Sequence, residues 1–296
     1  MKKTTLIIIA VVICSCKFVG QNIGNSEKQK KDAVGHLESH TVLNKDSIIR
    51  TIHQIKNLEF PFAKNTENII SHTGFSFIFN DAHKQSDWVV YMLCRERLPT
   101  APDAEKRPSI DFKVDPAVKT GTATHKDYTN SGYDRGHLAP CRDLQWSYKT
   151  MIESFYMSNI CPHLGTFHQA GGIWYKLEDL VRVWTEEYDT LYIVAGPALK
   201  QKIMDTIFGK DNKVSVPKYF YKVILNYTSN RIEGIGFIMP NEKVKSGNDI
   251  RSYATSIDSV QKFTGIDFFH KLPAVQQKYI ESRFCDTCWI WEKPKK

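Results

Sequence analysis

Residues 132–140, Gly-Tyr-Asp-Arg-Gly-His-Leu-Ala-Pro, carry the residue types needed to hydrolyse a phosphate ester. Within this segment Arg135, Gly136 and His137 are consecutive. A neutral histidine can take a proton from water near pH 7, and the planar guanidinium of arginine can hold phosphate oxygens. Glycine between them lets the backbone turn or approach another group closely. The combination predicts phosphodiester chemistry, although a charged surface loop would also fit residues 134–137 alone.

Further blocks follow in a characteristic order: residues 143–147, 153–162, 174–182, 194–197, 216–225, 236–241 and 264–269. This order resembles the DNA/RNA non-specific endonuclease family, the ββα-metal nucleases that include secreted bacterial nucleases and mitochondrial endonuclease G. The resemblance covers residues 70–285 approximately. Several independent blocks match, which makes it far more specific than one short motif.

The resemblance implies a role for four residues. His137 matches the general base, and Arg135 matches an arginine that supports phosphate binding or the geometry of the site. Glu178 matches a helix carboxylate that orients metal-bound waters, and Arg182 matches an arginine that stabilises transition-state charge. By the same resemblance the cofactor is Mg²⁺ or Mn²⁺. The substrates are DNA and RNA, cleaved without sequence preference to leave 5′-phosphate and 3′-hydroxyl ends.

The chain departs from the family pattern at the metal ligand. The family carries an asparagine shortly before the helix tryptophan, but residues 167–174 here read Phe-His-Gln-Ala-Gly-Gly-Ile-Trp. Counting forward from Pro162 places the ligand at His168, whereas counting backward from Trp174 places it at Ala170. An insertion between Phe167 and Trp174 explains the difference. A second departure is His163, where the family usually has glutamine.

Three interpretations of this departure stay open. His168 replaces the asparagine, in which case its softer imidazole favours Mn²⁺, Ni²⁺ or Zn²⁺ more than an oxygen-only site does. Alternatively, Gln169 supplies an amide oxygen, or Ala170 occupies the place and the metal is weak or absent. We expect His168 to be the ligand, with Glu178 bound to the metal through water.

The pattern of apolar residues predicts an α+β fold around a mixed, largely antiparallel sheet, with the ββα-metal motif that the resemblance implies. Apolar residues at three- and four-residue intervals from Ile173 predict an amphipathic helix, which carries Glu178 and Arg182 as neighbours. A long functional loop is expected at 95–130. Strands are expected at 75–79, 88–93, 191–195, 219–227 and 232–239, and further helices near 47–55, 256–263 and 274–282.

Four side chains near the blocks are expected to be structural. The amide of Asn159 is expected to satisfy local backbone groups. Trp146, Phe155 and Tyr156 are expected in the core rather than on a base-stacking surface.

The N-terminus predicts export. Lys2 and Lys3 precede an apolar run too short to span a bilayer, so residues 1–16 read as a signal peptide. Residues 13–16 also resemble a bacterial lipobox, which would lipidate Cys16 and tether the protein to a membrane. We therefore expect a bacterial protein that is periplasmic, outer-membrane-anchored or secreted. Residues 17–65 read as a variable polar tether and 66–292 as the endonuclease domain.

The net charge predicts a class of binding partner, and the cysteines predict disulfides. The formal charge is +8, and a basic balance favours a polyanionic partner. Cys285 and Cys288 are expected to form a local disulfide or to pair at long range, and Cys141 with Cys161 is a possible pair.

The leading hypothesis is a metal-dependent, sequence-nonspecific nuclease. The alternative is a catalytically lapsed nucleic-acid-binding protein on the same fold, for which the substituted ligand position is the support. A third hypothesis is hydrolysis of another phosphodiester, such as a lipid head group.

Overall fold

The computed structural model describes residues 52, 54–101, 104–107, 109–200, 206–243 and 249–292. The expected signal peptide, Cys16 and most of the helix expected at 47–55 lie outside these residues. No helix within the described residues is both long and apolar enough to cross a bilayer.

A seven-stranded sheet forms the centre of the fold, and all of its neighbouring strands are antiparallel. The five strands expected from the sequence are confirmed within it. In spatial order the strands are β1 (Ile69–Ser71), β2 (Ser76–Asn80), β3 (Gln85–Cys94), β6 (Thr190–Pro197), β9 (Tyr219–Thr228), β10 (Arg231–Pro240) and β11 (Ala254–Thr255).

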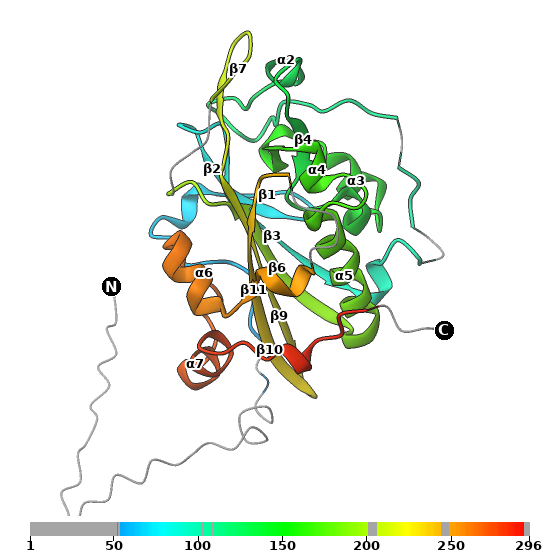
Figure 1. The fold of residues 1–296 in the computed structure, drawn as a ribbon, viewed down its shortest axis with the longest axis vertical. Helices are drawn as coiled ribbons and strands as arrows, with labels where there is room; N and C mark the ends of the chain where they lie inside the picture. The colour runs from blue at the N-terminus through cyan, green and yellow to red at the C-terminus, as the bar shows by residue number, and fades with distance from the viewer. Residues whose placement is uncertain are drawn as a thin grey trace, which may run out of the picture. The chain divides into compact units, whose positions relative to one another are not determined.

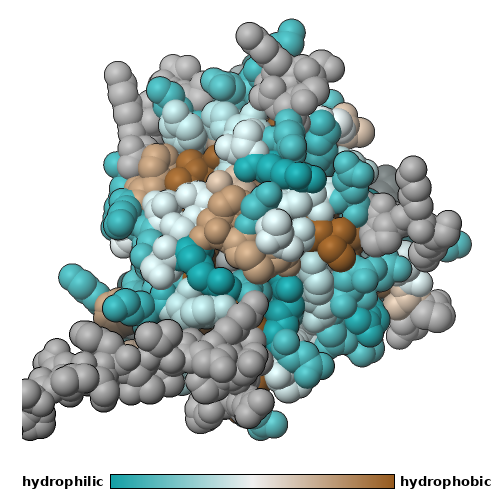
Figure 2. Space-filling model, turned by 60° about the horizontal axis from the view of Figure 1, so that its bottom comes forward, coloured by the Kyte–Doolittle hydropathy of each residue, from teal (hydrophilic) through white to brown (hydrophobic). Residues whose placement is uncertain are grey.

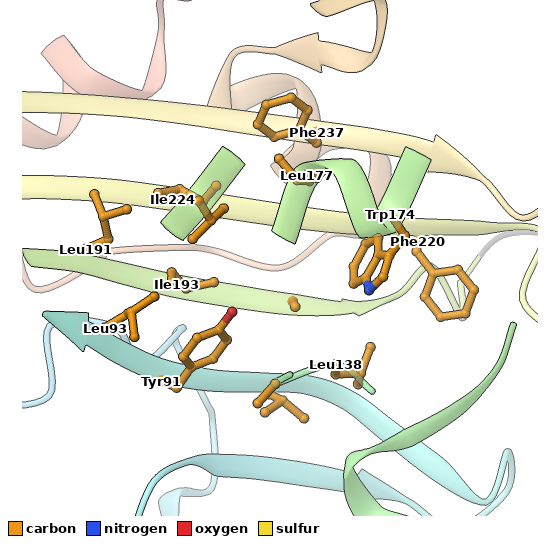
Figure 3. Packing of buried hydrophobic residues seen from close by; sticks show 14 of the residues in the cluster. Tyr91, Leu93, Leu138, Trp174, Leu177, Leu191, Ile193, Phe220, Ile224 and Phe237 are labelled. Atoms are coloured by element: carbon orange, nitrogen blue, oxygen red, sulfur yellow. The ribbon is translucent and has the colours of Figure 1, made fainter. Parts of the chain in front are cut away.

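Helices cover both faces of this sheet (Figure 1). Helix α5 (Ile173–Tyr188) packs on one face, and α6 (Ile257–Thr264) with α7 (Ala274–Glu281) pack on the other. Side chains alternate along a strand, so the alternate residues of β3 divide between the two cores. Tyr91 lies in the core under α5, where Figure 3 shows it near Leu93 and Ile193, whereas Trp88 lies in the core under α6.

A second, two-stranded ribbon carries the Asp-Arg-Gly-His segment. It pairs β4 (Asp134–His137) with β5 (Ile160–His163), with Asp134 opposite His163 and His137 opposite Ile160. The short helix α4 (Gly165–His168) follows β5, and α5 comes next. Two strands and a helix therefore follow one another as the ββα motif requires.

Short elements connect these parts. They are η1 (Thr66–Asn68), η2 (Arg95–Arg97), α2 (His125–Tyr128), η3 (Cys141–Leu144), α3 (Tyr148–Glu153), η4 (Met157–Asn159), β7 (Thr206–Phe208), β8 (Lys213–Ser215), η5 (Ile250–Tyr253) and η6 (Asp286–Cys288). Of the described residues in the expected loop 95–130, only those of η2 and α2 are helical, and Lys113 makes an isolated bridge to Tyr156.

The packed part of the chain begins before residue 66. Leu58 is buried in the core under α6, and the Phe60 ring lies 6.3 Å from the Trp88 ring. The backbone of Phe62 donates to the carbonyl of Asp267 at 2.8 Å. The final residues of the expected tether thus belong structurally to the folded body.

Cys285 and Cys288 form the local disulfide, which confirms one of the two expected arrangements. Cys141 and Cys161 do not pair, because both are free and buried. The disulfide begins a C-terminal strap, residues 285–292, that packs on the end of α5. Within it Trp289 is buried, with its ring 4.5 Å from the ring of Trp184.

Candidate active site

The β4–β5 ribbon brings backbone and side chain unusually close at Gly136. A Cβ atom there would lie 1.9 Å from Nδ1 of His163, which is fully buried on the neighbouring strand. No side chain larger than hydrogen fits. Gly136 therefore serves close approach within a strand rather than the turn that its sequence position also allowed.

The ring of His137 packs against two phenylalanines that also contact each other. Its ring centroid is 5.5 Å from that of Phe112 and 5.3 Å from that of Phe155. Its Nε2 atom is buried and has no hydrogen-bond partner among the residues that the structure describes. Burial, and secondarily the charges of Arg107 and His168, lowers the pKa of His137 from 6.5 to about 3. The imidazole is consequently neutral at pH 7.

An arginine side chain packs on each of these two phenylalanine rings. The guanidinium of Arg135 lies 4.8 Å from the ring centroid of Phe112 and also contacts His125. The guanidinium of Arg107 lies 5.3 Å from the ring centroid of Phe155. Cation–π contact with an aromatic face holds a guanidinium in place without neutralising it. Each of the two rings that contact His137 therefore also holds a cation.

Sequence reasoning missed Arg107. It lies in the aperiodic segment 95–130, where neither spacing nor a motif distinguishes one cation from another. The available signal was the expectation that this loop carries function.

Arg182 of α5 is fixed by two carboxylates. Its Nη1 donates to Asp143 and its Nη2 to Asp179, each at 2.7 Å, and the residue is 8% exposed. Burial would lower the pKa of Arg182, but the charges of Asp143 and Glu178 raise it above its usual value. Arg182 forms these ion pairs with Asp143 and Asp179 rather than with Glu178, which lies one turn away on the same helix.

Glu178 faces a buried cation from the sheet. Lys222 of β9 is 0% exposed, and its Nζ lies 4.4 Å from the ring centroid of Trp174. Burial lowers the pKa of Lys222, and the charge of Glu178 opposes that effect. Burial likewise raises the pKa of Glu178 from 4.5 to about 7, with Lys222 and Arg182 opposing. The protonation state of Glu178 on α5 thus depends on the nearby charges of Lys222 and Arg182.

The two halves of the site meet at Trp174. Its indole Nε1 donates to the carbonyl of His137 at 3.3 Å. Figure 3 shows the Trp174 ring beside Phe220 and near Leu138, which follows His137 in the chain. The amide of Asn159 fixes the same turn, exchanging 2.9 Å hydrogen bonds with the backbone N and O of Ala139. This confirms the expected structural role of Asn159.

His168 and Gln169 converge on one carboxylate. His168 Nε2 lies 2.9 Å from Oδ2 of Asp134, and Gln169 Nε2 donates to the same atom at 2.8 Å. Ala170 is exposed and is followed by Gly171, whose φ of +90° suits glycine. Residues 169–172 form the link between α4 and α5, and both polar candidates for the ligand place, His168 and Gln169, lie against Asp134.

A family model described as DNA/RNA non-specific endonuclease matches residues 53–275. The chain belongs to this family. Mitochondrial nuclease EXOG of Danio rerio is 31% identical over 235 residues, 75% of this chain and 66% of that protein. Human mitochondrial endonuclease G is 35% identical over 208 residues, 67% of this chain and 68% of that protein.

A solved complex of EndoG with EndoGI shares the fold. The match has a TM-score of 0.65 at 28% identity and covers 73% of this chain and 90% of that one. The expected α+β fold of a ββα-metal nuclease is thereby confirmed.

Family membership directs attention to the groups that could hold a divalent ion. Within the described part of the chain, no three His, Cys, Asp or Glu side chains cluster as a metal site. One imidazole and one carboxylate, from His168 and Asp134, do lie together. Such a sparse set fits an ion that keeps most of its waters and takes one or two protein ligands, and the imidazole favours Mn²⁺ over Mg²⁺.

Proposed function

We propose that this protein is a metal-dependent, sequence-nonspecific endonuclease that hydrolyses DNA and RNA phosphodiesters with His137 as general base. The supporting observation is the site around Trp174. There the segment that carries His137, whose Nε2 atom has no hydrogen-bond partner among the described residues, meets the helix that carries Glu178 and Arg182. Family membership supports the nuclease class.

In this proposal His137, neutral because of its burial, accepts the proton of the attacking water through Nε2, the ring nitrogen that has no hydrogen-bond partner among the described residues. Arg107 and Arg135, held on the two phenylalanine rings that contact the imidazole, bind the phosphate oxygens. Arg182, locked by its two carboxylates, supplies a fixed positive charge near the developing negative charge.

His168 and Asp134 would hold the divalent ion, Mg²⁺ or Mn²⁺, with Glu178 acting through water. When bound, the ion neutralises phosphate charge and stabilises the leaving oxygen. Before any ion binds, Asp134 fixes the His168 ring through their hydrogen bond.

The test is digestion of plasmid DNA and of RNA by the full chain, first in EDTA and then with Mg²⁺ or Mn²⁺. Degradation should require the ion and should fall by about 10²- to 10⁴-fold in His137→Ala. A matched control is His270→Ala, which removes an imidazole packed on Phe62 away from the site. Equal activity of His137→Ala and wild type would remove His137 as the base.

A catalytically lapsed nucleic-acid-binding protein is the second candidate, favoured by the departure at residues 168–170. It predicts retained DNA binding without cleavage in any metal. Calorimetric titration of His168→Ala with Mn²⁺ tests the ligand separately. An unchanged heat of binding would exclude His168.

We also propose that residues 1–16 direct export from a bacterial cell and that Cys16 anchors the mature chain to a membrane. Loss of detergent partitioning in Cys16→Ala would support the anchor, and its retention would oppose it.

A further inference from the structure

An aromatic surface lies beside the active site. Trp146 is half-buried and outside the core clusters, contrary to its expected place, and the guanidinium of Arg97 lies 4.4 Å from its ring centroid. Tyr148, at the start of α3, is 57% exposed, the largest value among the exposed large hydrophobic side chains of the described residues. Phe155 is buried as expected, whereas Tyr156 is half-buried.

Two connections join this surface to His137. The backbone of Glu105 donates to the carbonyl of Gln145 at 2.7 Å, next to Trp146. Two residues further on, Arg107 lies over Phe155, which contacts the His137 ring. The second connection is η3, which links the His137 strand to Trp146 in the chain.

The charges around this surface favour a polyanion. Arg142 is exposed and pairs with Asp179 of α5 at 3.2 Å. The Lys149 side chain, next to Tyr148, is 71% exposed and pairs loosely with Glu153 at 3.8 Å. Both pairs are open to solvent on the cation's side, so phosphate can compete for these cations. A groove that combines cations for the backbone with aromatic faces for the bases is the usual way to bind a single nucleic-acid strand.

We propose that Trp146, Tyr148 and the cations around them bind unpaired bases of the strand that flanks the cleaved bond. This inference rests on the proposed nuclease function. Every base has a π-face, so stacking binds without reading sequence, as a nonspecific enzyme requires. In a duplex these faces are covered by neighbouring bases, so the surface favours frayed or single-stranded substrates.

The test is binding of a fluorescent single strand of about 12 nucleotides in EDTA, followed by anisotropy. Tyr148→Ala should weaken the Kd about 5- to 100-fold, the effect of losing one stacked base. Tyr148→Phe keeps the ring and should bind like wild type. An abasic strand of equal length keeps the phosphates but offers no base, so Tyr148→Ala and wild type should bind it equally.

Phe62→Ala is the matched control, since Phe62 is 53% exposed and packs on His270, away from α3. Trp146→Leu repeats the measurement at the second ring. The proposal is overturned if Tyr148→Ala loses no affinity, or loses it equally for normal and abasic strands.

Hydrolysis separates this proposal from the proposed function. With metal present, Tyr148→Ala should raise KM for the single strand several-fold more than for bis(p-nitrophenyl) phosphate, which has no base. If wild type cleaves neither compound, the nuclease proposal fails, while the contrast between normal and abasic strands still decides the stacking surface.

Discussion

Phe112 and Phe155 set the properties of both the base and its cations. Their rings shield part of the imidazole of His137 from water, which disfavours its charged form. The same two rings hold the guanidinium groups of Arg135 and Arg107 without cancelling their charge. One pair of apolar side chains therefore keeps the imidazole neutral beside two cations.

The depressed pKa of His137 predicts a stability that depends on pH. The folded protein binds this proton only below about pH 3, whereas the unfolded chain binds it below pH 6.5. Between these values the unfolded state holds more protons, so stability is full above pH 6.5 and declines as pH falls toward 3. At pH 4 the loss should reach about 3 kcal/mol.

Urea unfolding of wild type and His137→Phe between pH 7 and 4 measures this effect. Phenylalanine does not titrate, so the variant should lose less stability on acidification. If the free energy of unfolding fell equally with pH in both proteins, the lowered pKa of His137 would be contradicted.

Arg107 should act on activity rather than on folding. Arg107 is exposed and packs on the ring of Phe155, so Arg107→Ala should leave the thermal midpoint near that of wild type. Its loss removes one cation from the phosphate, which predicts a fall in kcat/KM of about 10- to 100-fold. Arg95→Ala, also exposed but paired with Asp189, is the control and should retain activity. If Arg107→Ala were as active as wild type, Arg107 would not be a phosphate-binding residue.

At the scale of elements, long periodic segments were predictable and short polar ones were not. The alternation in β3 and the helical spacing in α5 each bury one face, which fixes element type. Strand β4 is four residues with no apolar alternation, and only its pairing with β5 makes it a strand. The burial of Lys222 was equally hidden, since a strand pattern does not reveal that a lysine will stack on Trp174.

The residue at the metal-ligand position could not be predicted from the sequence for a related reason. Counting along the chain gives His168 or Ala170, and only the three-dimensional path of the α4–α5 link shows His168 and Gln169 both against Asp134. Spacing cannot place an insertion within a loop.

The C-terminal strap should stabilise the end of α5. Trp184 donates to the carbonyl of Ile290, and Tyr188 OH accepts from the backbone of Ile290 at 3.0 Å. Trp289→Ala should cost about 3–5 kcal/mol of unfolding free energy, as for other buried aromatic truncations. Replacing both Cys285 and Cys288 with serine should cost about 2 kcal/mol, because the closed loop is short.

Denaturant unfolding of these variants measures the two effects, and Trp291→Phe provides a conservative comparison. If Trp289→Ala unfolds at the wild-type denaturant concentration, the strap does not support the helix.

At the scale of the whole molecule, the amino-acid composition alone predicted a net positive charge. The formal charge of +8 falls to about +6 if Lys2 and Lys3 are removed with a signal peptide. Figure 2 shows hydrophobic side chains as limited patches between hydrophilic ones on one face. Electrostatic attraction to phosphate, rather than apolar contact over a wide area, is then the main source of affinity.

This argument predicts a strong dependence of nucleic-acid binding on salt. If Arg107, Arg135, Arg142 and Lys149 each contact a phosphate, the logarithm of affinity for a single strand should fall with the logarithm of salt concentration with a slope of about −3. Lys149→Gln should reduce the magnitude of that slope by about 0.7, whereas the same change at Lys278, which is exposed on α7 across the sheet, should leave it unchanged. Anisotropy titrations in EDTA at increasing NaCl give the slopes. A flat response would mean that phosphate contacts do not drive binding, and equal slopes for the two lysine variants would move the strand away from α3.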